Sequence, residues 1–219
     1  MMDDLFQDQI PTLPERQILG TGAVLLRHRL IPHARQLMED INTLAVSHPF
    51  RHMVTRRGHG MSVATSSYGD YGWVSNTQHG YHYAALDPLT GQPWPSIPIL
   101  WQTLATELAA TAGYTGFIPD SALVNRYATG ARMGLHQDRD EASLDWPIVS
   151  FSLGLPARFM FGGLTRQAQI NEVSLFHGDV VVWGGADRLR FHGIRPLKEG
   201  YHSLTGPYRY NLTFRRVQR

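Results

Sequence analysis

From Ser121 onward, the sequence alternates short β-prone runs with glycine-containing turns. The turns include Gly162-Gly163, Gly178-Asp179 and Gly184-Gly185. The runs are rich in branched and aromatic residues, and they cover 122–127, 148–155, 158–161, 172–176, 180–183, 188–192 and 209–214. Short strands at this spacing indicate an antiparallel barrel or a double-sheet sandwich of jelly-roll type rather than βαβ units.

Two helices are predicted before this β-rich region, over 33–47 and 97–112. Each carries one apolar stripe at helical spacing, formed by Leu37, Met38, Ile41, Leu44 and Ala45 in the first and by Leu100, Trp101, Leu104, Leu108 and Ala112 in the second. Gly113 provides a C-terminal stop for the second helix. Because both stripes are expected to face the core, the predicted fold class is mainly β with flanking helices (α+β).

The segment 48–96, between the two helices, is rich in Gly, Ser, Tyr, His and Pro and contains a weak strand pattern at 61–66. This composition predicts an irregular or hairpin insertion. Long loops on a rigid scaffold commonly carry recognition, so the segment is either a substrate lid or a surface excursion. We divide the chain into an N-terminal strand and helix extension (1–47), this lid (48–96) and a jelly-roll core (97–219).

The 219 residues fit one domain with a sizeable core, and they include no cysteine. A disulfide, a thiolate zinc site and a cysteine nucleophile are therefore excluded. Residues 1–6 are acidic where a secretory signal would be basic, and no apolar run approaches the roughly 20 residues of a membrane span. We expect a cytoplasmic protein without a membrane partner, and nothing in the sequence requires more than a monomer.

The basic side chains are almost all arginines, since Lys198 is the only lysine among 20 basic residues, which are set against 18 acidic ones. Arginine forms planar, bidentate contacts with phosphates and carboxylates, so the bias is compatible with an anionic partner. Genomic base composition explains the same bias equally well.

A candidate metal site consists of His136, Asp138 and the more distant His192. In an extended chain His136 and Asp138 share one face, whereas a helix would point them roughly 200° apart, so the pair requires a strand or a strand end. His-x-Asp alone is a weak signal, and the second histidine, in Phe191-His192-Gly193, strengthens it. Two imidazoles and one carboxylate leave open metal positions, which is typical of non-haem Fe(II) oxygenases rather than of closed structural zinc sites.

The segment 209–215 predicts a strand with one polar and one apolar face. The polar face holds Arg209, Asn211, Thr213 and Arg215, and the apolar face holds Tyr210, Leu212 and Phe214. If the apolar face packs under the helices, two guanidinium groups line the barrel and demand an anion such as a dicarboxylate, with one arginine for each end. An edge strand with solvated arginines is the alternative. Asn125 and Tyr127, which share a strand face just upstream of the metal motif, favour the first arrangement.

Several motifs resemble those of the bacterial AlkB proteins in residues, order and spacing. They are Asn125-Arg-Tyr127, His136-Gln-Asp138-Arg-Asp140-Glu141, Ser152-Leu-Gly-Leu-Pro156, Phe161-Gly-Gly163, His177-Gly-Asp-Val-Val-Val-Trp-Gly-Gly185, His192-Gly193 and the segment 209–215. The resemblance covers nearly the whole chain from about residue 20. It implies a double-stranded β-helix (jelly-roll) dioxygenase that depends on Fe(II) and 2-oxoglutarate and acts on nucleic acids.

The same resemblance implies roles for individual residues. The iron ligands, on which catalysis depends, would be His136, Asp138 and His192. The residues that hold 2-oxoglutarate would be Asn125, Tyr127, Arg209, Asn211 and Arg215. O2 would take the remaining iron position, and oxidative decarboxylation would yield succinate and CO2 while the alkyl group of the base is hydroxylated and lost as formaldehyde. This chemistry needs no protein nucleophile.

A base inside a duplex cannot reach a buried iron, so such an enzyme must take single strands or flip the base into a pocket. The expected partners are alkylated single-stranded DNA and also RNA. By the resemblance, the substrate contacts would be Met61, Trp73, Tyr81, Asp140 and Arg166. Lesions such as 1-methyladenine and 3-methylcytosine are cationic, which gives a carboxylate beside the metal motif a role. Asp140 and Glu141 as a polar turn is the alternative, which we favour for Glu141.

Other functions fit parts of the pattern. A related oxygenase could act on a protein side chain or a small metabolite, which the pair Trp73 and Tyr81 disfavours. A nucleic-acid binding module without catalysis has no use for open iron positions. A cupin-like zinc protein would be distinguished by the metal that copurifies and by its response to 2-oxoglutarate. The lid segments 66–73 and 76–79 depart most from the family pattern, so lesion range and strand preference stay open.

Overall fold

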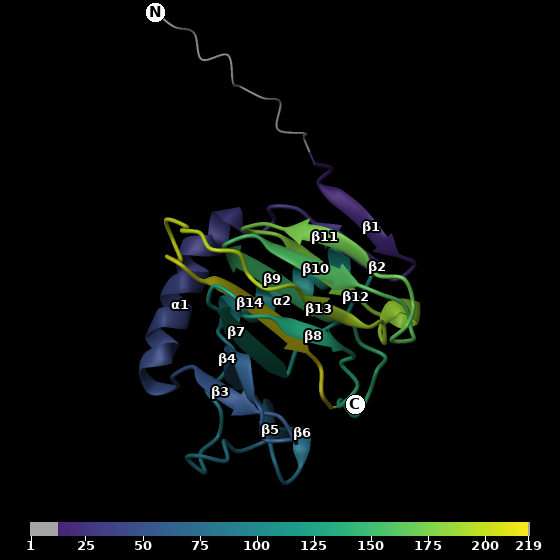
Figure 1. The fold of residues 1–219 in the computed structure, drawn as a ribbon. Coiled ribbons are helices and arrows are strands. Elements are labelled where there is room, and N and C mark those ends of the chain that lie inside the picture. The colour runs from purple at the N-terminus through teal and green to yellow at the C-terminus, as the bar shows by residue number, and fades with distance from the viewer. Residues whose placement is uncertain (1–12, 219) are drawn as a thin grey trace, which may run out of the picture.

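The computed structural model describes residues 13–218, and its largest element is an eight-stranded sheet (Figure 1). Neighbouring strands in this sheet are antiparallel. From edge to edge they are β1 (Arg16–Gly20), β2 (Ala23–Leu26), β12 (Val180–Trp183), β9 (Ile148–Gly154), β14 (Arg209–Arg215), β7 (Ser121–Tyr127), β4 (Gly60–Gly69) and β3 (Arg51–Val54). The predictions made for the acidic amino terminus lie outside the described residues.

A four-stranded sheet packs against one face of the large sheet (Figure 1). Its strands, in spatial order, are β11 (Asn171–Leu175), β10 (Ala157–Phe161), β13 (His192–Ile194) and β8 (Met133–His136). Val181 and Trp183 of β12 and Phe159 and Phe161 of β10 belong to one buried apolar cluster. The two sheets therefore face one another across a shared interior.

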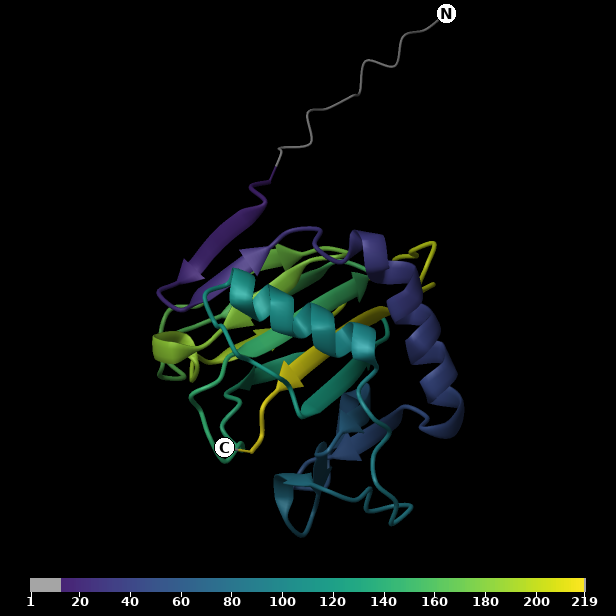
Figure 2. The ribbon, with the colours of Figure 1, turned by 180° about the vertical axis from the view of Figure 1, so that it is seen from behind.

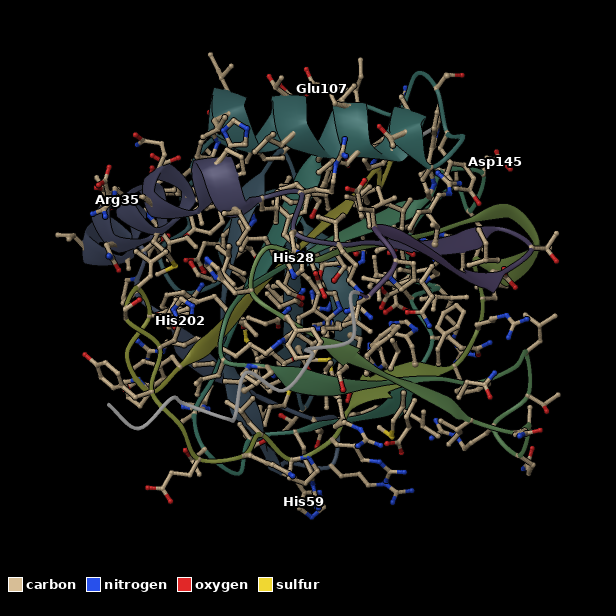
Figure 3. All side chains as sticks on the ribbon, turned by 90° about the horizontal axis from the view of Figure 1, so that it is seen from above. His28, Arg35, His59, Glu107, Asp145 and His202 are labelled. Carbon is tan, nitrogen blue, oxygen red and sulfur yellow. The ribbon has the colours of Figure 1, made fainter. Side chains whose placement is uncertain are left out.

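The opposite face of the large sheet is covered by α1 (Ala34–Ser47) and α2 (Ile99–Thr111), as Figure 2 shows from behind. A second apolar cluster joins Leu37 and Trp101 of these helices to Phe214 of the sheet. Seen from above, both helices lie on the same side of the sheets (Figure 3). Within residues 13–218, no helix is long and apolar enough to cross a membrane. Two short 3-10 turns are η1 (Ile31–His33) and η2 (Gly185–Asp187).

Strand β14 lies in the middle of the large sheet and separates its two faces by side-chain alternation. It is paired with β7 on one side and β9 on the other, so it is not an edge strand. Its apolar residues belong to the cluster under the helices, and these are Tyr210, Leu212 and Phe214. Its polar residues line a cavity on the other face, and these are Arg209, Asn211, Thr213 and Arg215. Of the two arrangements that the sequence left open, the one with the arginines inside is the observed one.

About half of the segment 48–96 is β structure, so the hairpin form of the predicted insertion is the observed one. β3 and β4 extend the large sheet, so the weak strand pattern predicted at 61–66 lies within a longer strand that pairs with β7. β5 (Gly72–Asn76) and β6 (Gly80–Ala84) form a separate two-stranded hairpin beyond this edge (Figure 1). The hairpin is joined to β3, because Ser75 Oγ donates to the carbonyl of Val54 at 2.6 Å.

The predicted mainly β fold with flanking helices is confirmed, and both predicted helices are correct to within two residues at each end. The strand predicted at 188–192 is wrong, because β13 begins only at His192. Residues 188–191 follow the 3-10 turn η2, and the side chain of Arg188 turns inward, where its Nε donates to the carbonyl of Trp146 at 3.0 Å. The other predicted strands are confirmed.

Two histidines cap backbone amides near the start of β14. His177 Nδ1 accepts a hydrogen bond from the Gly154 N–H at 3.0 Å, and His202 Nδ1 accepts one from the Leu204 N–H at 3.2 Å. Their ring centroids are 4.4 Å apart. Burial, followed by the neighbouring His202, lowers the pKa of His177. Because Nδ1 accepts a hydrogen bond in each ring, the ring proton lies on Nε2.

Acidification is expected to destabilise the fold at His177. Because its folded-state pKa lies below the unfolded value of about 6.5, the unfolded state binds more protons, and stability falls as the pH drops below that value. Urea unfolding at about pH 7.5 and about pH 5.5 should show a larger loss for the wild type than for His177→Gln. The exposed His59 provides a control, since His59→Gln should behave as the wild type. Equal losses in all three proteins would contradict this role of His177.

Candidate functional site

A cavity of about 830 Å³ lies between the two sheets and the β5–β6 hairpin. Its volume falls within the range of roughly 300–1,000 Å³ found for small-molecule sites. Every residue that the sequence predicts to contact metal, cofactor or substrate lines this cavity: His136, Asp138, His192, Asn125, Tyr127, Arg209, Asn211, Arg215, Met61, Trp73, Tyr81, Asp140 and Arg166. The fold therefore brings the predicted site residues together in one place.

The three candidate metal ligands are assembled by strand pairing. His136 ends β8, and it is the direct register partner of His192 in β13. Asp138 follows two residues after the end of β8, on the same side as His136. One ligand atom from each of the three residues lies within 4.8 Å of the others. The Asp138 carboxylate is 3.6 Å from His136 Nε2 and 3.8 Å from His192 Nε2.

Backbone carbonyls fix which nitrogen of each imidazole is free. His136 Nδ1 lies 2.9 Å from the carbonyl oxygen of Gly134, and His192 Nδ1 lies 3.0 Å from that of Arg190. A carbonyl can only accept, so each Nδ1 carries the proton and each Nε2 presents its lone pair toward Asp138. His177 has the opposite arrangement, because its Nδ1 accepts from a backbone N–H. His136 and His192 therefore leave Nε2 free to bind a metal, whereas His177 uses Nδ1 in a structural hydrogen bond.

Electrostatics keep His192 and Asp138 in the forms that bind metal. Burial, followed by the proximity of His136, lowers the pKa of His192 to about 4, so this imidazole is neutral at neutral pH. Burial alone would raise the pKa of Asp138, but Arg215 first, and then the two histidines, hold it well below its usual range. Arg215 Nη2 and Nε donate to Asp138 Oδ2 at 2.6 and 3.1 Å. Asp138 is therefore an oriented carboxylate.

Two further charged residues complete this cluster, and the sequence analysis missed their part in it. Arg188 Nη1 donates to the backbone carbonyl of Asp138 at 2.6 Å. Glu141 was expected to be part of a polar turn, but its carboxylate is buried and lies 3.1 Å from Arg188 and 3.3 Å from Arg215. Glu141 also accepts a hydrogen bond from the hydroxyl of Tyr83 at 2.9 Å. No local pattern marks these residues, because their contacts join distant parts of the chain.

Arg209 is a buried cation with unused hydrogen-bond donors. Its Nη2 donates to Ser152 Oγ at 3.1 Å, while Nε and Nη1 have no partner among the described residues. The guanidinium lies 5.0 Å from the centre of the Tyr127 ring, and burial lowers the pKa of Arg209. A buried guanidinium without a counter-charge is costly, so the site fits an anionic ligand. The orphaned nitrogens match a carboxylate.

The Asn211 amide is already satisfied within the protein. Its Nδ2 donates to Ser150 Oγ at 2.8 Å and to the carbonyl of Phe151 at 2.9 Å. Its Oδ1 accepts from Asn125 Nδ2 at 3.1 Å and from Thr213 Oγ1 at 3.0 Å. With both donors and both lone pairs in use, Asn211 holds the amide of Asn125 in place. Ser150 and Thr213 also line the cavity and were not proposed as site residues from the sequence.

The β5–β6 hairpin contributes aromatic side chains to the cavity. The rings of Trp73 and Tyr81 are stacked, with centroids 5.4 Å apart and planes 17° apart, and Tyr81 is about half exposed. Met61, from β4, lies beside them in the cavity lining. A partly exposed, flat aromatic surface near a metal-ligand set suits a planar ligand.

Charged residues surround the part of the cavity next to the metal motif. Asp140 is exposed, and partial burial, followed by Glu141 and Asp138, raises its pKa. Arg166 Nη1 donates to the carbonyl of Leu135 at 2.9 Å. Arg132 and Arg139, which sequence reasoning did not single out, line the cavity as well. The cations suit a polyanion, and the carboxylate suits a positively charged group within it.

Comparison with known proteins places this site in a family. The sequence profile of the 2OG-Fe(II) oxygenase superfamily matches residues 22–215. The alpha-ketoglutarate-dependent dioxygenase AlkB of Salmonella typhimurium is 51% identical over 216 residues, which cover 99% of this chain and 98% of the relative. The human nucleic acid dioxygenase ALKBH1 is 30% identical over 143 residues, which cover 63% of this chain and 34% of the human protein.

A solved structure shows the same fold. The structure of OsALKBH1 superposes with a TM-score of 0.82 at 29% identity, over 92% of this chain and 99% of that one. Alpha-ketoglutarate is another name for 2-oxoglutarate, a dicarboxylate. The chain belongs to the AlkB family within the 2OG-Fe(II) oxygenase superfamily, and its cofactors are Fe(II), 2-oxoglutarate and O2.

Proposed function

We propose that this chain removes alkyl groups from nucleic-acid bases by oxidation, with 1-methyladenine and 3-methylcytosine as typical substrates. With O2 as oxidant, hydroxylation of the alkyl carbon is coupled to decarboxylation of 2-oxoglutarate, which yields succinate, CO2, formaldehyde and the unmodified base. The observation that carries the proposal is that stacked Trp73 and Tyr81 share one cavity with His136, Asp138 and His192. An aromatic pair suits a base that has left its stack.

Fe(II) is proposed to bind His136 Nε2, His192 Nε2 and the Asp138 carboxylate. Bound iron would supply the oxidation of a C–H bond by O2 and 2-oxoglutarate. The protein prepares the ligands beforehand, because backbone carbonyls hold both imidazoles as Nε2 donors and Arg215 orients the carboxylate. Such prior orientation of ligands by surrounding hydrogen bonds strengthens metal binding.

2-Oxoglutarate is proposed to bind on the interior face of β7 and β14. Arg209 would pair with one carboxylate through its two unpartnered nitrogens, beside the ring of Tyr127. Within residues 13–218, Arg215 has one nitrogen without a partner, Nη1, because its other donors hold Asp138. Asn125 would contribute its remaining N–H, with Asn211 holding its amide in place. The sequence predicts one arginine for each carboxylate of the ligand. Arg209 is free to pair in this way with two nitrogens, whereas Arg215 offers only one.

The alkylated base is proposed to lie against Trp73 and Tyr81, with the ring of His136 and the side chain of Met61 beside it. Asp140 would favour a cationic methylated base over its neutral product, because a carboxylate attracts only the former. Release of the product is thereby assisted by the loss of charge that repair itself causes. Arg166 would contact the phosphate backbone. All of these residues line the same cavity.

We extend the proposal to the architecture around the site. The two facing sheets would form a double-stranded β-helix within the core 97–219, and the segment 48–96 would act as the nucleotide-recognition lid next to the extension 1–47. The hairpin supports this role because it supplies both aromatic residues. Alkylated single-stranded DNA is the proposed main substrate and RNA a second one. The enzyme would act as a monomer in the cytoplasm.

The proposal is tested by mass spectrometry of a single-stranded oligonucleotide that carries 1-methyladenine. After incubation with the protein, Fe(II), ascorbate and 2-oxoglutarate in air, the oligonucleotide should lose one methylene mass, and formaldehyde should appear. Asp138→Ala should abolish the conversion because it removes a metal ligand. Succinate formed without any loss of mass from the oligonucleotide would refute base dealkylation while leaving a 2-oxoglutarate oxygenase.

Removal of the Trp73 ring should weaken nucleic-acid binding. If the indole stacks on a base, Trp73→Ala should cost about 1–3 kcal/mol of binding free energy, measured by fluorescence anisotropy with a labelled oligonucleotide. Tyr201→Ala is a suitable control, since Tyr201 is a highly exposed aromatic residue outside the cavity lining. Equal affinities for the two variants would count against stacking at Trp73.

A further inference from the structure

We propose that Tyr83 is a positioning residue that fixes the β5–β6 hairpin over the metal-ligand carboxylate through Glu141 and Arg215. The inference rests on the proposed function, since it concerns how the aromatic pair of the hairpin is placed relative to the metal site. Neither Tyr83 nor Glu141 lines the cavity, so both act through other residues.

Three aromatic side chains share one face of the hairpin. Tyr83 is the direct cross-strand partner of Trp73, and Tyr81 lies two residues earlier on the same strand. Opposite partners and residues two apart point to the same side of a hairpin. Trp73 and Tyr81 stack in the cavity, whereas Tyr83 extends to Glu141. One face of the hairpin thus carries both the aromatic surface and the contact that places it.

The contact continues from Tyr83 to the metal ligand in three steps. The Tyr83 hydroxyl donates to Glu141 Oε1 at 2.9 Å, and this oxygen lies 3.3 Å from Arg215 Nε. Arg215 in turn donates to Asp138 Oδ2 at 2.6 Å. The side chains of Glu141 and Arg215 are 1% and 8% exposed. The first and last of these contacts are hydrogen bonds to carboxylates, and the middle one is a buried ion pair. Charge-assisted contacts of this kind are strong and specific in geometry.

Charge balance requires that each member of this cluster stay in place. Asp138 and Glu141 supply two negative charges, and Arg188 and Arg215 supply two positive ones. The Tyr83 hydroxyl adds a neutral donor to Glu141, and burial raises its pKa well above the usual range, so it stays protonated. Loss of the hydroxyl would therefore remove one geometric link without changing the net charge of the cluster.

The hairpin needs such a link because it forms a sheet of its own. Among the described residues, three other side-chain hydrogen bonds hold it: Ser67 Oγ donates to the carbonyl of Trp73, Ser75 Oγ to that of Val54, and Trp94 Nε1 to that of Ala84. Those contacts join the hairpin to other parts of the lid segment. The hydrogen bond from Tyr83 to Glu141 instead ties it to the charged residues around the candidate metal ligands.

The test compares Tyr83→Phe with Tyr114→Phe. Tyr114 is a matched control, because its hydroxyl also donates within the protein, at 2.7 Å to the carbonyl of Gly22, but outside the cavity lining. Three quantities are measured: oligonucleotide affinity by anisotropy, 2-oxoglutarate affinity from the visible charge-transfer absorption of the Fe(II) complex without O2, and the ratio of succinate to formaldehyde during turnover.

For Tyr83→Phe, the oligonucleotide dissociation constant should rise on the order of tenfold, as expected for the loss of a hydrogen bond to a charged acceptor. The succinate-to-formaldehyde ratio should rise as well, while 2-oxoglutarate affinity stays at the wild-type value because Arg209 is untouched. Tyr114→Phe should match the wild type in all three quantities.

Two results would overturn the proposal. One is an oligonucleotide affinity for Tyr83→Phe equal to that of Tyr114→Phe. The other is an equal loss of oligonucleotide and 2-oxoglutarate affinity, which would mean general loosening of the site. Failure of the proposed function is recognised separately, because a wild-type enzyme that releases no formaldehyde leaves the affinity comparison intact.

Discussion

The burial of four charged side chains beside the cavity is the constraint on which the rest of the site depends. Asp138, Glu141, Arg188 and Arg215 neutralise one another, and each has contacts that the others cannot replace. A buried charge without its partner is strongly destabilising, so the cluster specifies one arrangement of the loops that meet there. That arrangement places the Asp138 carboxylate between two imidazoles. Arg209, which lines the same cavity, is a buried cation without a counter-charge among the described residues.

Strand pairing and backbone carbonyls position and orient the two imidazoles. His136 and His192 are far apart in the sequence, yet they are direct partners across β8 and β13. The carbonyls of Gly134 and Arg190 then fix both rings with Nε2 free. The helices contribute indirectly, because the apolar residues of β14 pack beneath them and alternation turns the polar residues inward. The chemistry of the site thus follows from the pleat of a central strand.

The sequence predicted much of this, because its strongest signals are local. Side-chain alternation in 209–215 and the His-x-Asp spacing each need only one strand to be interpreted. What could not be predicted depends on contacts between distant segments: Glu141 was taken for a turn residue, and Arg188 was assigned to a strand although its guanidinium is buried against Asp138. Asn211 shows the same limit, since periodicity gives the face on which it lies but not the fact that its amide is already satisfied.

The most direct test of the account is an anaerobic titration of the protein with Fe(II) and then with 2-oxoglutarate, followed by visible absorption. The account predicts a charge-transfer band that needs both components, is absent in Asp138→Ala, and requires much more 2-oxoglutarate in Arg209→Met, a variant that keeps the volume but loses the charge. Arg158→Met, which changes an exposed arginine, should titrate as the wild type. If Arg209→Met reached the full band at the same 2-oxoglutarate concentration as the wild type, the claim that the buried guanidinium and the metal ligands form one site would be contradicted.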